Sequence, residues 1–218
     1  MFRYNFYCIG KLYFEIITCD EKRYRCTFFD GKQELYSAEL GEGEWMATDS
    51  RKYIGDYFVE IRRLDGVLVE RISFLHSLKG KRVFITFGSS SLGDTIAWMP
   101  YCLMFKKKYQ CDVIVSTFKN WMFEKVYPEL QFVQPGSIVE NIVAMPDIGW
   151  HWDDSKEPVN PATIPLQQTA CNILHLPYKG DSKPRIDYKP KPISFDKIVC
   201  ISTEVQLNVN IGITGQNL

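Results

Sequence analysis

The stretch Lys81-Arg82-Val83-Phe84-Ile85-Thr86-Phe87, followed by Gly88-Ser89-Ser90-Ser91-Leu92-Gly93-Asp94, decides the fold. Its first seven residues are almost continuously apolar, which is typical of a parallel strand buried on both faces. After the small-residue loop, a helical pattern runs from Asp94 to about Tyr109 and ends in three lysines, which the helix dipole favours. A buried strand, a loop and a helix in this order predict a parallel α/β sheet.

The same alternation continues downstream, whereas the residues upstream follow a different pattern. Further apolar strands are predicted at 112–116, 130–133 and 138–145, a short helix at about 120–126, and another helix at about 164–174. In residues 1–77, short runs alternate apolar and polar side chains around Asp30-Gly31 and Asp65-Gly66. A glycine at this place supplies the positive φ that a hairpin turn needs, so the pattern predicts antiparallel strands.

These patterns predict an α/β fold in which a small antiparallel β domain precedes a Rossmann-like parallel sheet. A segment with Pro177, Pro184, Pro190 and Pro192 resembles a linker, and the apolar run 197–203 after it reads as a fresh strand. That run is either a sixth strand of the first sheet or the start of a truncated second domain, and we favour the second interpretation. The expected divisions are a β domain (1–78), a Rossmann-like domain (79–176), a Pro-rich linker (177–196) and the first strand of a truncated Rossmann-like domain (197–218).

The composition excludes several classes of protein. With 26 basic and 26 acidic residues among 218, the balanced charge disfavours a nucleic-acid binder. No apolar run approaches the roughly 18 residues of a membrane span, so we expect no membrane insertion. The N-terminal residues contain no apolar signal-peptide core, and the odd number of cysteines, seven, does not suit a disulfide framework. We therefore expect reduced thiols and a cytoplasmic protein.

The loop after the first buried strand is the candidate binding site, because ligands of open α/β sheets bind at the carboxyl ends of the strands. Ser89, Ser90 and Ser91 offer hydroxyls, and Gly93 allows a ligand to approach the backbone. The glycine spacing fits neither a Walker A loop nor a dinucleotide-binding fingerprint. Asp94 has two possible roles, as a helix cap or as a general base that deprotonates an attacking hydroxyl.

A second candidate follows the predicted strand 138–145. Trp150 lies either in an ordinary exposed loop or in a cleft wall, where its large apolar face stacks on a sugar. His151, Asp153 and Asp154 are residue types that bind metals, but their spacing matches no zinc or calcium pattern. We therefore assign no metal site.

The run from Phe87 to Tyr101, which contains Leu92-Gly93-Asp94-Thr95, resembles the corresponding segment of the bacterial autotransporter O-heptosyltransferases. These proteins are relatives of the lipopolysaccharide heptosyltransferases. The stretches 57–78, 115–120 and 127–133 are similar to that family as well, and the resemblance covers about residues 10–203.

The resemblance implies a GT-B fold, of which the Rossmann-like sheet here is the N-terminal half. It further implies inverting transfer of heptose from ADP-heptose to serine hydroxyls of an autotransporter adhesin, without a catalytic metal. Asp94 matches the proposed base, and the neighbouring candidates for substrate binding are Ser89, Ser90, Ser91, Gly93, Thr95 and Trp150. Members of the family form large homo-oligomers and carry an iron site built from C-terminal cysteines.

The sequence departs from the family after residue 203, where the donor pocket and the iron-binding cysteines have no counterpart. We therefore expect no cofactor within this chain, an iron site only in a missing C-terminal part, and poor transferase activity of this chain alone. Two other functions remain open. One is a non-catalytic fragment that binds an acceptor or mediates assembly, and the other is a nucleotide-dependent Rossmann oxidoreductase.

Overall fold

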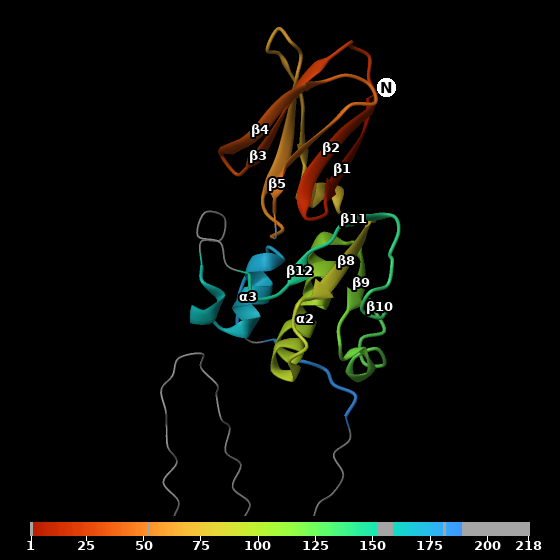
Figure 1. Cartoon of the computed structure of the whole chain (residues 1–218), viewed down its shortest axis with the longest axis vertical. Helices are drawn as coiled ribbons and strands as arrows, with labels where there is room; N and C mark the ends of the chain where they lie inside the picture. Colours follow the sequence, from red (N-terminus) through yellow and green to blue (C-terminus); the bar gives the residue numbers. More distant parts are fainter. Residues whose placement is uncertain (1, 52, 152–158, 181, 189–218) are drawn as a thin grey trace, which may run out of the picture. The chain divides into compact units, whose positions relative to one another are not determined.

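The structure, a computed structural model, describes residues 2–51, 53–151, 159–180 and 182–188. Met1–Asp187 forms one compact unit. Its N-terminal part, in which Figure 1 labels β1 to β5, is built from β strands and a one-turn helix. They are β1 (Arg3–Cys8), β2 (Lys11–Thr18), β3 (Tyr24–Asp30), β4 (Gln33–Leu40), β5 (Trp45–Ser50), β6 (Tyr57–Arg62), β7 (Leu68–Ser73) and α1 (Phe74–Ser77).

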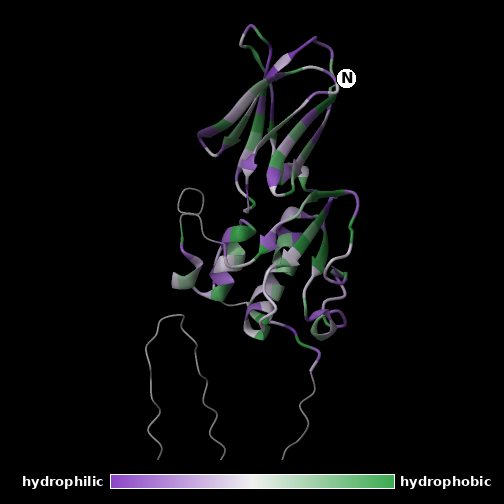
Figure 2. Ribbon diagram, in the orientation of Figure 1, coloured by the Kyte–Doolittle hydropathy of each residue, from purple (hydrophilic) through white to green (hydrophobic). Residues whose placement is uncertain are grey.

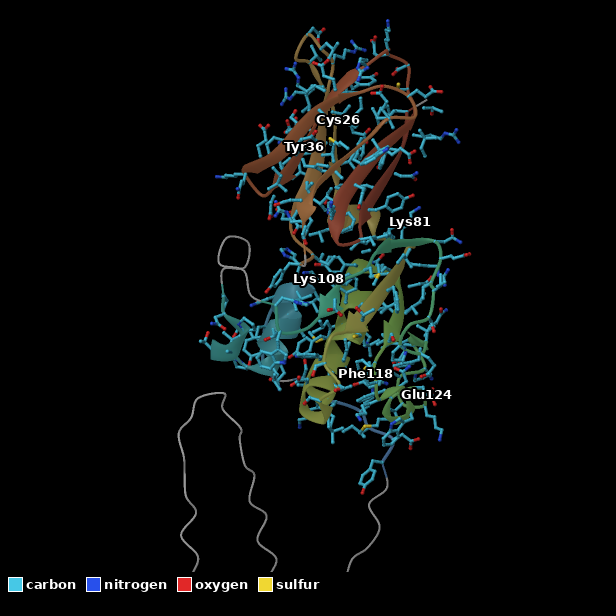
Figure 3. All side chains as sticks on the ribbon, viewed as in Figure 1. Cys26, Tyr36, Lys81, Lys108, Phe118 and Glu124 are labelled. Carbon is cyan, nitrogen blue, oxygen red and sulfur yellow. The ribbon has the colours of Figure 1, made fainter. Side chains whose placement is uncertain are left out.

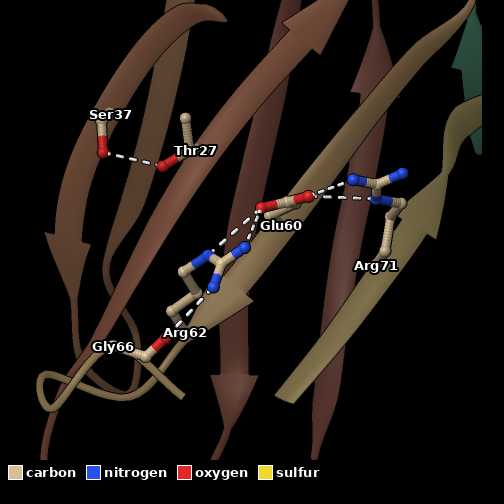
Figure 4. Close-up of polar contacts among 6 residues, drawn as sticks. All are labelled: Thr27, Ser37, Glu60, Arg62, Gly66 and Arg71. Carbon is tan, nitrogen blue, oxygen red and sulfur yellow. Dashed lines mark hydrogen bonds and ion pairs between the residues drawn. The ribbon is translucent and has the colours of Figure 1, made fainter. Parts of the chain in front are cut away.

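Four of these strands form an antiparallel sheet in the order β4-β3-β6-β7. Hydrophobic and hydrophilic residues are mixed along its strands (Figure 2). One face, with Cys26, Phe28 and Val59, is buried in the core, and the opposite, mostly polar face also carries the stacked rings of Phe29 and Phe58. On the polar face, Glu60 lies between Arg62 and Arg71, and Thr27 and Ser37 share a hydrogen bond of 2.8 Å (Figure 4). The Asp-Gly hairpin predictions are confirmed, since Gly31 and Gly66 both have positive φ.

The C-terminal part begins with the predicted strand, loop and helix. They are β8 (Arg82–Phe87) and the 18-residue helix α2 (Leu92–Tyr109), which continues through Pro100, and β9 (Asp112–Ser116) then pairs with β8 in parallel. After the 3₁₀ turn η1 (Asn120–Met122) come the short strands β10 (Gln131–Phe132), β11 (Ile142–Ala144) and β12 (Asp147–Ile148). The 3₁₀ turn η2 (Pro161–Thr163) precedes the last described helix, α3 (Leu166–Ile173), which packs on α2.

The strand order contains an arrangement that the sequence patterns did not predict. The parallel strands and three strands of the N-terminal part share one sheet, in the order β10-β9-β8-β11-β1-β2-β5, with β12 paired to β8. The joint is a parallel pair at Cys8 and Ala144, where the Met145 N–H donates to the Cys8 carbonyl at 2.9 Å. β1 therefore belongs to both parts of the molecule.

Two predicted elements differ from the structure, and a third is not tested by it. Of the expected strand 138–145, only β11 (Ile142–Ala144) is a strand, because Asn141 adopts a left-handed conformation before it, and β12 begins only after Pro146. The expected helix at 120–126 contains only the 3₁₀ turn η1. The predicted strand 197–203 lies outside the described residues. No helix in the part of the chain that the structure describes is both long and apolar enough to cross a membrane.

Candidate active site

The loop between β8 and α2 is held close to the end of β12. The Gly88 N–H donates to the Ile148 carbonyl at 2.9 Å. A Cβ at Gly88 would lie 2.9 Å from Oδ2 of Asp147, so a larger residue here would require the Asp147 side chain to shift. Glycine allows this close approach without such a shift. The result is a small-residue turn that leads directly into the first turn of α2.

Asp94 lies in that first turn and is 8% exposed. One of its carboxylate oxygens, Oδ2, accepts two side-chain hydrogen bonds, from the Ser89 hydroxyl at 2.6 Å and from the Trp150 indole N–H at 3.0 Å. Within the described residues, no main-chain amide donates to Asp94, and Oδ1 accepts no hydrogen bond. The carboxylate is thus oriented by two side chains rather than used as a cap.

Trp150 is brought to Asp94 from a segment 56 residues away along the chain. Its side chain is anchored by the indole N–H, while the residue as a whole remains 49% exposed. An anchored but exposed indole leaves a large apolar surface next to a carboxylate. The sequence patterns left open whether Trp150 lies in an ordinary loop or in a cleft wall. They did not predict its hydrogen bond to Asp94.

The remaining candidates from the sequence lie on the same turn. Ser90, Ser91 and Gly93 are exposed, and the Ser91 N–H donates to the Ser89 hydroxyl at 3.1 Å. The Cβ position of Gly93 has only the Ser91 hydroxyl within 4 Å, so there is space beside it. Thr95 is fully buried and its hydroxyl donates to the Ser91 carbonyl at 2.7 Å. In this arrangement Thr95 stabilises the turn from inside.

Sequence reasoning missed a second carboxylate at this edge of the sheet. Asp147 Oδ1 accepts a hydrogen bond from the Thr86 hydroxyl at 2.6 Å, and Oδ2 lies 3.2 Å from His151 Nε2. His151 Nε2 is also 3.0 Å from the carbonyl of Asp147. The position of Asp147 in the sequence could have identified it. An aspartate directly after a predicted parallel strand lies at the same edge of the sheet as the end of β8.

The described cysteines do not suit a metal centre. Cys8, Cys26, Cys102, Cys111 and Cys171 are buried, and burial raises the pKa of each thiol, to about 12 for Cys26 and to about 11 for Cys171. Such thiols stay protonated at neutral pH, whereas iron and zinc bind thiolates. Among the residues with described positions, no three His, Cys, Asp or Glu side chains gather into a possible metal site. The residues that the structure describes therefore do not fit an iron centre.

Comparisons with known proteins find similarity to autotransporter heptosyltransferases. No protein-family model matches the chain. The autotransporter heptosyltransferase TibC of Escherichia coli O78:H11 (strain H10407 / ETEC) is 22% identical over 180 residues, which are 80% of this chain and 43% of TibC. The autotransporter heptosyltransferase Aah of Escherichia coli is 26% identical, over 78% of this chain and 44% of Aah. An inactive autotransporter heptosyltransferase, BimC of Burkholderia thailandensis, is 27% identical over 46% of this chain and 23% of BimC.

Solved structures show the fold. The crystal structure of the iron-containing dodecameric glycosyltransferase TibC from enterotoxigenic E. coli H10407 matches with a TM-score of 0.68 and 21% identity, over 88% of this chain and 50% of TibC. TibC in complex with ADP-D-beta-D-heptose matches with a TM-score of 0.67 and 20% identity. The chain spans less than half the length of TibC and Aah as curated. It is similar to autotransporter heptosyltransferases over about 80% of its own length, and it has the α/β fold of the matching half of TibC.

Proposed function

We propose that this chain takes part in the transfer of a heptose from ADP-heptose to serine hydroxyls of an autotransporter adhesin, with Asp94 as the general base. One observation carries the proposal. Asp94 stands at the carboxyl end of a parallel strand with Oδ2 held by Ser89 and Trp150 and with Oδ1 accepting no hydrogen bond from the described residues. A base needs both an orienting contact and an oxygen left for the incoming proton.

The proposed reaction is a single displacement with inversion. The acceptor serine gives its hydroxyl proton to Asp94 Oδ1 while its oxygen forms a bond to the anomeric carbon of the heptose. The bond between that carbon and the diphosphate oxygen breaks, and ADP leaves with the electron pair. The described residues contribute the base and its orientation, and no step in this scheme requires a metal.

The neighbouring residues support substrate binding in this scheme. The exposed Ser90, Ser91 and Gly93 lie at the N-terminal end of α2, where backbone N–H groups without helical partners favour a polar or anionic ligand. The exposed face of Trp150 is suited to contact the apolar side of a sugar ring. For Thr95, the buried hydroxyl supports an indirect role through the shape of the turn rather than direct contact with the ligand.

The remaining expectations belong to the same proposal. We place the reaction in the cytoplasm, supported by the six described cysteines, all of which are free thiols. We expect self-association, because TibC is dodecameric. The divisions at residues 78, 176 and 196 stay predictions of the sequence pattern, and the one at residue 78 crosses the shared sheet. We also expect this chain alone to turn over slowly, because the donor-side groups of the family have no counterpart in its sequence.

Replacement of Asp94 by Asn tests the base. Wild-type and Asp94→Asn chains are incubated with excess ADP-heptose and an adhesin passenger domain, and heptose on serine is quantified by intact mass spectrometry over hours. We expect the variant to be slower by about 100- to 10,000-fold, the usual contribution of a general base. Trp150→Phe, which keeps a ring but removes the N–H, is expected to fall between the two.

Asp112→Asn is the matched control, because Asp112 is exposed at the opposite, amino end of β9. It is expected to react like wild type. Equal rates for wild type and Asp94→Asn would remove Asp94 as the base, and fast turnover by the wild-type chain would contradict the expected poor activity.

A second candidate function is non-catalytic, as an acceptor-binding or assembly subunit. Similarity to BimC, described as inactive, favours this candidate over the oxidoreductase. Capture of an adhesin passenger by the chain, with no transfer by wild type or Asp94→Asn, would establish the second candidate and exclude the first.

A further inference from the structure

The sheet opens beside β1. β1 pairs with β2 along its whole length, from Arg3 to Cys8, but it pairs with β11 only at Cys8 and Ala144. Upstream of Cys8, β1 and the residues before β11 diverge. Within the described residues, the second edge of β1 therefore has no strand partner between Arg3 and Tyr7.

A cavity of about 940 Å³ lies along this open edge. One wall is the run 2–7, which contains most of β1, and the facing wall is formed by residues 141–143 at the start of β11. Ser77 and Lys81 contribute side chains from the segment between α1 and β8. The walls are two strands of one sheet that meet at Cys8 and Ala144, so the cavity follows the unpaired edge of β1.

Backbone polarity along β1 suits an added strand. The Cys8 carbonyl accepts from the Met145 N–H, so it points toward the β11 side. Alternate residues of an extended strand direct their N–H and C=O groups to the same side, which places those of Tyr4 and Phe6 along the cavity. An edge strand with unpaired backbone groups is a template for another chain. The run 2–7 spans about 17 Å at 3.4 Å per residue, enough to align about five residues of a peptide.

The charged side chains around the cavity indicate which kind of peptide would bind there. The charged side chains that line the cavity are Arg3 and Lys81, both exposed, and no carboxylate lines it. Lys81 is labelled in Figure 3 at the start of β8. Glu70 contributes to the raised pKa of Tyr4, after the larger effect of burial, but it does not line the cavity. A second copy of this chain paired edge to edge would bring Arg3 and Lys81 toward the equally positive Arg3 and Lys81 of its partner, so the charges do not favour a second copy.

We propose that the open edge of β1 binds an extended, acidic peptide segment of a protein partner by strand addition. Main-chain hydrogen bonds to Tyr4 and Phe6 supply the affinity, and Arg3 and Lys81 select carboxylates. This binding function is separate from the transfer chemistry at Asp94, and its test needs no transferase activity.

The experiment uses the 218-residue chain and a fluorescein-labelled peptide of alternating Thr and Asp, with fluorescence anisotropy as the readout. We expect saturable binding that is at least 10-fold tighter than that of the same peptide with Lys in place of Asp. The charge-reversed variant Arg3→Glu/Lys81→Glu should weaken the acidic peptide at least 10-fold and tighten the basic one. The control Lys11→Glu/Lys79→Glu changes charge equally at exposed residues outside the cavity lining and should bind like wild type.

Strand addition is separated from simple charge attraction by N-methylation of the peptide backbone. Methyl groups on alternate amides along one edge should abolish binding, while methyl groups on the other amides should leave it intact. Equal effects of the two methylated peptides, or equal binding to the charge variant and its control, would overturn the proposal. So would self-association of the chain that is lost in Arg3→Glu/Lys81→Glu, because the occupant would then be a second copy.

Discussion

At the scale of single residues, Glu60 is the side chain with the clearest electrostatic role. Its carboxylate is 8% exposed on the polar face of the four-stranded sheet, with Arg62 on one oxygen and Arg71 on the other (Figure 4). Hydrogen bonds from Arg71 and then Arg62 lower the pKa of Glu60 below its ordinary value of 4.5. A lowered pKa means that the folded state favours the ionised form, so this carboxylate stabilises the fold at neutral pH.

Glu60→Gln is expected to lower the free energy of unfolding at pH 7 by about 1–3 kcal/mol, the size of hydrogen bonds to charged groups. The loss should be complete above pH 4.5 and should shrink as the pH falls through the lowered pKa, because wild-type Glu60 is then protonated too. Urea unfolding of wild type and Glu60→Gln at several pH values measures this loss of unfolding free energy. Glu39→Gln removes an exposed pair with Arg25 and should cost about 0.5 kcal/mol or less, so equal losses would contradict the assignment.

Some residues of the candidate site were predictable from the sequence, and others were not. Asp94 and Ser89 are close in sequence on a recognisable turn, so local pattern was enough to select them. Trp150 was selected only for its type, and its contact with Asp94 depends on how the end of β12 meets the end of β8. Asp147 was missed because its importance comes from strand register rather than from a motif.

At the scale of elements, the end of α2 carries a strained residue. Gln110 follows the helix with φ 53° and ψ 40°, the left-handed conformation that glycine adopts at no steric cost. Its carbonyl accepts from the Gly80 N–H at 2.9 Å, so the conformation serves the connection between α1 and β8. A side chain in this conformation costs about 1–2 kcal/mol, which a glycine would avoid at some cost in chain entropy.

Gln110→Gly is therefore expected to raise the free energy of unfolding by about 0.5–1 kcal/mol, measured by urea titration. Lys107→Gly is the control, because Lys107 is exposed in the last turn of the same helix with ordinary helical geometry. There, glycine should lower stability by about 1 kcal/mol. A loss of stability in both variants would show that the Gln110 conformation is not strained.

Elements with strong local patterns were predictable, and those set by tertiary context were not. β8, α2 and β9 fall close to their expected bounds, because a continuous apolar run, a helix with an acidic start and a basic end, and a second apolar run are read from neighbouring residues. The run 138–145 looked like one strand, but the left-handed Asn141 delays the strand, which covers only Ile142–Ala144. A left-handed conformation at a non-glycine residue has no reliable signal in one sequence.

At the scale of the whole molecule, the described residues before and after residue 78 share structure. β1 packs Phe6 against Phe28 and Phe74, with ring centroids 5.9 and 5.1 Å apart, while its backbone joins β11. A second link is the Ile54 N–H, which donates to the Ile173 carbonyl at the end of α3 at 2.8 Å. These contacts favour a single cooperative unit, although the sequence pattern changes from antiparallel β to α/β near residue 78.

We therefore expect one unfolding transition for both parts. Cys26 in β3 and Cys102 in α2 are both fully buried, so each thiol reacts with a maleimide only after its own part opens. With labelled peptides quantified by mass spectrometry at increasing urea, the two thiols should become reactive at the same midpoint, because breaking the shared sheet exposes both cores together. Separate midpoints would show that residue 78 divides two independently folding domains, and the Cys8–Ala144 joint would then be a contact between domains rather than a part of one core.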